Sequence, residues 1–202
     1  MKKQSLLLPV LLLIFLMVSC NPTGEKKSVL ETNSSDTLAK KTTALNDSLL
    51  KPQQLLSTKS GLKVPVYAFE GFEQAVLKRN EENITYVVNF WATWCKPCVA
   101  ELPFFLELEK MYKDKKVKFI FVSLDFMNNL ELTLIPFLDD RKISSEIIVL
   151  DQKDADVWME KIDKNWSGSI PATLIYNTKN RIFVEDNFSN TKELEDLLKP
   201  LL

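Results

Sequence analysis

The stretch "NFWATWCKPC" (residues 89–98) places two cysteines two residues apart, where a strand is expected to give way to a helix. It overlaps the run "ITYVVNFWA" (84–92), which is apolar on both faces, as a central strand covered on both sides should be. Residues 95–113 then carry a wide apolar face at helical spacing. Two cysteines in this setting can bind a metal, close a structural disulfide, or exchange electrons with another thiol pair.

The local setting of the two cysteines favours thiol chemistry. Cys95 is expected at the start of the helix, where unpaired backbone N–H groups and the helix dipole favour a thiolate. Cys98 would lie one turn further on, close enough to attack a mixed disulfide on Cys95. Lys96 adds a positive charge beside Cys95, and Pro97 occupies an early helix position where its missing N–H costs nothing. The motif therefore predicts a dithiol–disulfide exchange site.

The two other uses of a cysteine pair fit the sequence less well. A closed structural metal site needs four ligands, whereas this pair supplies two and the chain has no histidine. A purely structural disulfide would suit an oxidising compartment, but so short a loop removes little entropy from the unfolded chain. We expect no metal, and the structural disulfide remains the alternative to a redox-active pair.

The composition of the 202-residue chain excludes several other classes of function. Without histidine, Ser–His and Cys–His nucleophile pairs cannot form. The chain has four glycines and no glycine-rich phosphate-binding motif. Its net charge of −1 gives no general electrostatic reason to bind nucleic acid. We expect no cofactor and no nucleic-acid partner.

The N-terminal segment has the pattern of a lipoprotein export signal. Lys2 and Lys3 precede an almost wholly apolar stretch (5–18), which is short for a membrane span and typical of a signal peptide. Its end, "LMVSC", resembles a bacterial lipobox, so residues 1–19 would be removed and Cys20 would carry the lipid. That assignment leaves the other two of the three cysteines as a pair. An uncleaved membrane anchor is the alternative.

A change in composition near residue 60 indicates a domain boundary. Residues 20–60 are rich in Ser, Thr, Lys and Asn, contain no aromatic residue and lack a sustained apolar period. Such a segment cannot bury enough apolar surface to offset the entropy lost on ordering. We interpret residues 20–60 as a flexible, lipid-anchored tether and residues 61–202 as one domain.

Strand and helix patterns alternate through this domain, which predicts an α/β sandwich with a mixed sheet. Asp154 and the sequence "TKEL" from Thr191 predict the N-terminal caps of two of the helices. Strands are expected at 62–69, 84–92, 117–125, 146–150, 172–177 and 181–186, and helices at 70–79, 95–113, 130–141, 154–161 and 191–198.

A strand, "FWATWCKPC", a long helix and, far downstream, "GSIPATLIYN" together resemble the thioredoxin superfamily, in particular its membrane-tethered TlpA/ResA-like thiol–disulfide oxidoreductases. Asn89 stands where thioredoxins have a buried aspartate, and Glu101 and Pro103 follow the cysteines as in this branch. The resemblance covers roughly residues 60–202. It implies a three-layer sandwich whose mixed central sheet is flanked by helices, with an extra helix–strand insertion before a cis-proline.

The resemblance also implies roles for individual residues. Cys95 would be the attacking thiol and Cys98 the resolving one. The Ile170–Pro171 bond would be cis and present its backbone to an extended substrate segment. Glu101, with a pKa raised by partial burial, would exchange a proton with the Cys98 thiol; a solvated helix glutamate is the alternative. Independently of the resemblance, the position of Trp94 directly before Cys95 predicts that it lines the substrate surface.

These expectations predict a lipoprotein of the bacterial cell envelope that faces the periplasm and exchanges disulfides with other proteins. Cys20 would attach it to a lipid membrane, inner or outer. The resemblance favours the reducing direction, which requires a membrane electron donor. A disulfide-introducing oxidant and a non-catalytic binding lipoprotein with a structural disulfide are the alternatives. A monomer is the default.

Overall fold

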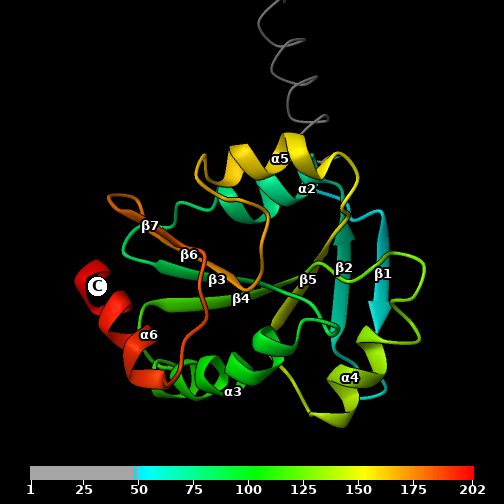
Figure 1. The fold of residues 1–202 in the computed structure, drawn as a ribbon, viewed down its shortest axis with the longest axis horizontal. Coiled ribbons are helices and arrows are strands. Elements are labelled where there is room, and N and C mark those ends of the chain that lie inside the picture. Colours follow the sequence, from blue (N-terminus) through cyan, green and yellow to red (C-terminus); the bar gives the residue numbers. More distant parts are fainter. Residues whose placement is uncertain (1–47, 49) are drawn as a thin grey trace, which may run out of the picture.

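The computed structural model describes residue 48 and residues 50–202, and its central feature is a seven-stranded mixed sheet (Figure 1). The strands are β1 (Gln54–Ser57), β2 (Lys63–Tyr67), β3 (Thr85–Trp91), β4 (Val117–Ser123), β5 (Glu146–Leu150), β6 (Ala172–Tyr176) and β7 (Arg181–Val184). Their order in the sheet is β1-β2-β5-β4-β3-β6-β7. Strands β2, β5, β4 and β3 are parallel, whereas β1, β6 and β7 each pair antiparallel with their neighbours.

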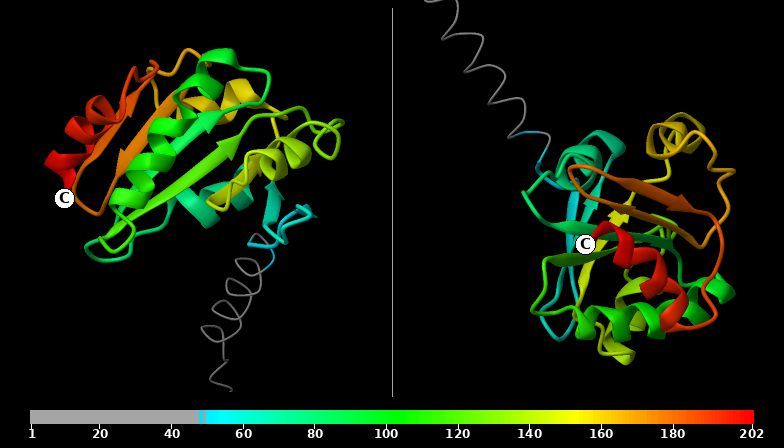
Figure 2. Two further views of the ribbon diagram at one scale, coloured as in Figure 1. Left: turned by 90° about the horizontal axis from the view of Figure 1, so that it is seen from below. Right: turned by 90° about the vertical axis from the view of Figure 1, so that its left-hand side faces the viewer.

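Helices cover both faces of the sheet (Figure 1, Figure 2). They are α2 (Phe69–Phe72), the π-helix η1 (Glu73–Leu77), α3 (Lys96–Met111), α4 (Leu134–Asp140), α5 (Ala155–Ile162), α6 (Thr191–Leu198) and the 3₁₀-helix η2 (Lys199–Leu201). Helices α3, α4 and α6 bury their apolar residues in one core, and α2, η1 and α5 bury theirs in a second core across the sheet. The predicted three-layer α/β sandwich is confirmed.

Strand β3 is the central strand that leads to the cysteines, and all seven of its residues are buried. Val87 and Trp91 belong to the core beneath α3, α4 and α6. Tyr86, Val88 and Phe90 belong to the core beneath α2 and α5. Because both faces are covered, the sequence of this strand shows a continuous apolar run instead of polar alternation.

Helix α4 and strand β5 form the insertion expected between β4 and the cis-proline. Strand β5 occupies residues 146–150, as predicted, and pairs in parallel with β4 on one side and β2 on the other. The insertion therefore widens the sheet on the side away from β6 and β7.

The folded domain begins earlier than the sequence predicts. Residues 20–60 were expected to form a tether, but Gln54–Ser57 form β1, which pairs antiparallel with β2. Only Leu56 of this strand is buried, so its sequence lacks the alternation that marks a strand. The predicted signal peptide (1–19), Cys20 and most of the tether lie outside the described residues. Within the described part of the chain, no helix is long and apolar enough to cross a membrane.

Two predicted helix caps also differ from the structure. Asp154 precedes α5 but has left-handed backbone (φ 55°) and makes no side-chain cap hydrogen bond, whereas capping side chains normally extend from β-region backbone. At α6 the cap is Asn190, one residue before Thr191: its side chain accepts the N–H of Glu193 over 3.0 Å. The Glu193 carboxylate in turn accepts the N–H of Ser189, the residue before the cap, over 2.8 Å, so the helix is capped one residue earlier than predicted.

Candidate active site

Cys95 and Cys98 form a disulfide at the start of α3, with their Cα atoms 5.3 Å apart. Cys95 is the N-cap residue, and its Sγ accepts the backbone N–H of Cys98 over 3.3 Å. The sulfur therefore lies among the unpaired N–H groups of the helix start. Cys95 is 5% exposed and Cys98 1% exposed, so an incoming thiol or disulfide reaches Cys95 first.

Lys96 and Pro97 separate the cysteines and open α3, with both side chains exposed. The ring of Pro97 fixes φ in the first turn, at a position where the helix does not use its N–H. Lys96 adds an exposed positive charge directly after Cys95 in the chain.

A second loop, from the C-terminal part of the domain, lies beside the disulfide. This segment, residues 166–171, is called the proline loop; the bond between Ile170 and Pro171 is cis. The carbonyl oxygen of Ile170 lies 3.6 Å from Cys95 Sγ. Strand β6 begins directly after the loop and pairs with β3, with Ala172 opposite Phe90, and this register holds the loop beside the cysteines.

The segment between β3 and α3, residues 92–95, is called the cysteine loop, and Asp125 fixes its backbone. The N–H of Thr93 donates to both carboxylate oxygens of Asp125, over 3.2 and 3.1 Å, and the Thr93 hydroxyl donates to Oδ1. The hydroxyl of Ser123 donates to Oδ2 over 2.8 Å. Asp125 is only 1% exposed, so this carboxylate is bound entirely by protein donors.

Two aromatic rings are exposed beside the cysteine loop. Trp94 is 52% exposed and Phe126 is 56% exposed, and their rings stack with centroids 5.7 Å apart and planes at 16°. Each residue directly follows one partner of the Thr93–Asp125 pair, so the buried hydrogen bonds bring the two rings together. Met127 adds further exposed apolar surface on the same segment. An apolar patch at the mouth of a site is typical of a binding surface.

Glu101 is buried in the first turns of α3, three residues after Cys98, with 1% of its surface exposed. Its Oε1 accepts the side-chain N–H of Asn89 over 3.0 Å, and its Oε2 accepts the backbone N–H of Phe188 over 2.9 Å. Burial raises the pKa of Glu101 from 4.5 to about 7, although both hydrogen bonds lower it. The alternative of a solvated helix glutamate is therefore wrong. A carboxyl group with this pKa can take or release a proton near neutrality.

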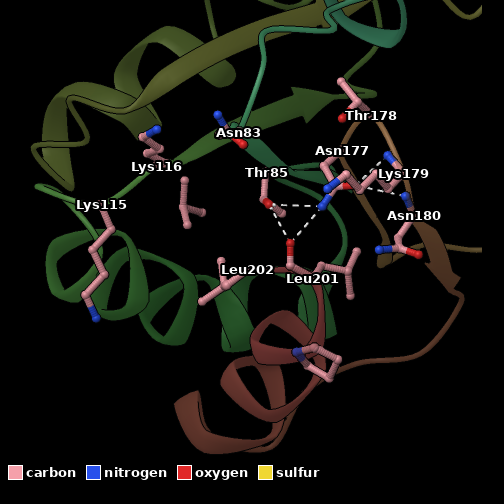
Figure 3. Close-up of a pocket in the computed structure, with 12 residues that line it drawn as sticks. Asn83, Thr85, Lys115, Lys116, Asn177, Thr178, Lys179, Asn180, Leu201 and Leu202 are labelled. Atoms are coloured by element: carbon pink, nitrogen blue, oxygen red, sulfur yellow. Dashed lines mark hydrogen bonds between the residues drawn. The ribbon is translucent and has the colours of Figure 1, made fainter.

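A pocket also lies at the other end of strand β3. Its volume is about 570 Å³, and its lining residues, drawn in Figure 3, include Thr85, the first residue of β3, whereas the cysteines follow the last residue of that strand. The Thr85 hydroxyl and the Asn177 amide both donate to the carbonyl of Leu201, over 2.9 and 2.7 Å. The cavity lining contains no cysteine, and its lysines are exposed. Among the described residues, no group of three or more His, Cys, Asp or Glu side chains could hold a metal ion.

The structure thus brings together Trp94, the two cysteines and the Ile170–Pro171 bond, and it adds residues that sequence reasoning missed. Asp125 and Phe126 lie 30 or more positions beyond the cysteine loop in the chain. The signal for Asp125 was a single charged residue at the end of the apolar run "FIFVSLD", which a solvated loop would show equally well. Cys20 lies outside the described residues.

Comparison with known proteins identifies the family. The redoxin family profile matches residues 61–184. The thiol-disulfide oxidoreductase ResA of Oceanobacillus iheyensis is 46% identical over 54 residues, which are 27% of this chain and 27% of that protein. ResA of Halalkalibacterium halodurans is 27% identical over 147 residues, which cover 70% of this chain and 78% of that protein.

Among solved structures, the comparison also finds a secreted Mycobacterium tuberculosis disulfide oxidoreductase. It superimposes with a TM-score of 0.47 at 20% identity and covers 77% of this chain and 99% of that one. The family profile spans the chain from β2 to β7 and contains both cysteines and the cis-proline. The chain therefore belongs to the redoxin family and is a ResA/TlpA-like member of the thioredoxin superfamily.

Proposed function

We propose that this protein is a thiol–disulfide oxidoreductase that reduces disulfides in other proteins of the bacterial cell envelope. One observation carries the proposal: the Cys95–Cys98 disulfide opens a helix, and its more exposed sulfur lies 3.6 Å from the carbonyl oxygen of Ile170. A disulfide that only stabilised the fold would gain little from so short a loop, and it would not need an exposed aromatic patch beside it.

The reaction balances as two thiol–disulfide exchanges. In the reduced protein, the Cys95 thiolate attacks one sulfur of the substrate disulfide, forms a mixed disulfide and expels the other substrate sulfur as a thiolate. Cys98, as a thiolate, then attacks Cys95 Sγ, expels the second substrate thiolate and closes the Cys95–Cys98 disulfide. Two electrons and two protons pass from the cysteine pair to the substrate, and a membrane electron donor would have to restore the dithiol.

Glu101 supplies a place for the proton that Cys98 loses. It lies one helical turn from Cys98 on α3, and its pKa of about 7 allows it to accept a proton at neutral pH. The hydrogen bonds from Asn89 and Phe188 hold the carboxylate in one orientation. Lys96 and Pro97 adjust the balance between the reduced and oxidised pair by favouring the thiolate and fixing the turn.

The substrate would lie across the two loops that flank the disulfide. The backbone of Ile170, before Pro171, can pair with an extended substrate segment, as strands do at a sheet edge. The stacked rings of Trp94 and Phe126 offer an apolar surface to the residues beside the substrate cysteine. We propose a monomer, anchored in the membrane through lipid on Cys20 and facing the periplasm, that needs neither cofactor nor nucleic acid.

The test is the reduction potential of the cysteine pair in the full chain. The protein is equilibrated in glutathione buffers of graded potential, its thiols are alkylated, and mass spectrometry counts the modified cysteines. A potential near about −270 mV marks a reductant, and one near about −120 mV marks an oxidant. A pair that stays oxidised throughout the series would leave the structural disulfide of a binding lipoprotein. The Cys95→Ser/Cys98→Ser variant provides the baseline and should reduce no protein disulfide.

A further inference from the structure

The proline loop is bound by a carboxylate that the reaction above does not use. Glu185 directly follows β7, and its Oε2 accepts the backbone N–H of Ser167 over 2.9 Å. Its Oε1 accepts the backbone N–H of Ser169, also over 2.9 Å, and the Ser167 hydroxyl donates to the same oxygen. Both oxygens of one side chain are therefore committed to a loop 16 to 18 residues earlier in the chain.

The loop is fixed from its inner side as well. The indole N–H of Trp166 donates to the carbonyl of Ser169 over 2.8 Å, and the Trp166 ring packs against Phe90 of β3 with centroids 4.9 Å apart. Gly168 adopts φ 93°, a conformation that residues with a Cβ rarely adopt, and so permits the turn between the two serines. Trp166 thus fixes the loop to the core, whereas Glu185 holds it from the outside.

Ser169 directly precedes Ile170 in the chain, so its position sets that of the Ile170 backbone. The carbonyl of Ile170 lies 3.6 Å from Cys95 Sγ. A loop released from Glu185 could rotate its peptide groups away from the disulfide while Trp166 kept the loop packed on the sheet. The effect of Glu185 on the site would then pass through Ser169 and Ile170 and not through the sulfurs.

The charge of Glu185 suits this task. Burial alone would raise its pKa, but the hydrogen bonds from Ser167 and Ser169 outweigh it and lower the pKa below its ordinary value. None of the salt bridges among the described residues involves Glu185. The ionised carboxylate therefore uses its acceptor capacity on the loop, with charge-assisted bonds that are stronger than neutral ones.

We propose that Glu185 is a positioning residue that holds the Ile170 backbone in the orientation required to pair with an extended protein substrate. The inference rests on the proposed function, because it assumes that a polypeptide binds along the proline loop. Two kinds of substrate should therefore respond differently to the loss of Glu185. A polypeptide disulfide needs the positioned backbone, whereas a small disulfide without peptide groups needs only access to Cys95.

The full chain is first reduced, and its reaction with each kind of substrate is then measured. The protein substrate is an unfolded protein whose cysteines have been reduced and then reoxidised to disulfides. Glu185→Ala should raise the KM for this substrate roughly tenfold, as expected for loss of charge-assisted hydrogen bonds. The kcat, the rate with 5,5′-dithiobis(2-nitrobenzoate) and the reduction potential of the cysteines should stay unchanged. Glu185→Gln should fall between wild type and Glu185→Ala, because its amide keeps one acceptor oxygen. Ser167→Ala, which removes only the hydroxyl bond, should have a smaller effect.

Glu160→Gln is the matched control, since Glu160 is an exposed carboxylate on α5. This variant should behave as wild type with both substrates. An unchanged KM for the protein in Glu185→Ala, or equal losses with both substrates, would overturn the positioning role while leaving the exchange activity in place. If wild-type protein exchanged with neither substrate, the proposed function itself would fail, and the two failures are therefore distinct.

Discussion

Each of the two loops beside the disulfide is held by a carboxylate, but one carboxylate is buried and the other is partly exposed. In the cysteine loop, Thr93 donates its N–H and hydroxyl to Asp125, which is almost fully buried. In the proline loop, Ser167 donates its N–H and hydroxyl to Glu185, which is partly exposed on the outside of the sheet. Each carboxylate binds a backbone N–H and a hydroxyl of one residue close to the site.

The difference in depth corresponds to a difference in task. The buried bonds of Asp125 hold the residues just before the attacking sulfur, whose position must not vary. If Glu185 is removed, water can take its place as acceptor for the exposed Ser167 and Ser169 at little cost, but a buried donor that loses Asp125 has no such substitute. We therefore expect the cysteine loop to depend on Asp125 for stability, and the proline loop to depend on Glu185 for substrate affinity.

Removing each carboxylate in turn is the strongest test of this contrast. Asp125→Ala should lower the free energy of unfolding by about 2–4 kcal/mol, because the buried hydroxyl of Ser123 and the half-buried N–H and hydroxyl of Thr93 lose their acceptor. Glu185→Ala should lower it by less than about 1 kcal/mol. Urea denaturation measures both losses. Asp125→Asn keeps one acceptor oxygen, so its loss in free energy of unfolding should lie between those of the two alanine variants. Equal losses for the two alanine variants would refute the contrast.

Glu101 extends the comparison to a third carboxylate, which is buried but accepts two neutral amide donors only. Since its pKa is about 7, wild-type protein should resolve mixed disulfides more slowly as the pH falls from 8 to 6. Glu101→Gln should be slower at pH 8 by roughly tenfold and should lose this pH dependence. Stopped-flow measurement of the resolving step across this range tests both points. A variant with the wild-type profile would exclude the proton role.

The same pKa predicts a slope in stability. The folded protein keeps a proton on Glu101 up to about pH 7, whereas the unfolded chain releases it near 4.5. The stabilising contribution of Glu101 should thus be complete below about pH 4.5 and decline as the pH rises toward 7. Glu101→Gln should lack that decline, and urea titrations at several pH values would detect it. A slope that persists in the variant would assign it to another group.

A smaller effect is expected at the exposed rings of Trp94 and Phe126. Alanine at either position should reduce kcat/KM for a protein substrate about three- to tenfold, the usual worth of one aromatic contact, with little change in stability. Leu132→Ala is the control, because Leu132 is 79% exposed on the same connection between β4 and α4 but is not part of the ring pair. Similar losses in all three variants would show that the ring pair has no special place in binding.

The smallest effect concerns the backbone of the proline loop. Gly168 and Gly61 both have positive φ, 93° and 91°, so alanine at either should cost about 1 kcal/mol of stability. A Cβ at Gly168 would also lie 3.1 Å from Met159 Sδ, whereas nothing lies within 4 Å at Gly61. Thermal denaturation should place Gly168→Ala slightly below Gly61→Ala, and Met159→Ala should remove that difference. Identical transitions would mean that the methionine moves away freely.

The core of the fold could be predicted because its signals are local. Strand β3 is buried on both faces, and the cysteines mark the start of α3, so both elements are evident in a single stretch of sequence. The same holds for β5, whose apolar run matches the observed strand. Strand β1 could not be predicted, because three of its four residues are exposed and its structure depends on pairing with β2.

The residues that shape the site were harder to find, because they act over long sequence separations. Asp125 lies 32 residues from Thr93, and Glu185 lies 16 residues from Ser169. A lone carboxylate after a strand has the same sequence signal whether it binds a distant backbone or water. The burial of Glu101 was only partly foreseen, since its donors come from Asn89 on β3 and Phe188 near the C-terminus. Only the folded chain brings such partners together.

The placement of Trp94 also gives the molecule an optical reporter of its own state. Of the four tryptophans, Trp91, Trp158 and Trp166 are buried, and only Trp94 is exposed. An indole in contact with water emits at longer wavelength than one in an apolar core, and a neighbouring disulfide quenches its excited state. Reduction of the pair should therefore brighten the long-wavelength side of the emission spectrum, so that turnover can be followed without any added dye.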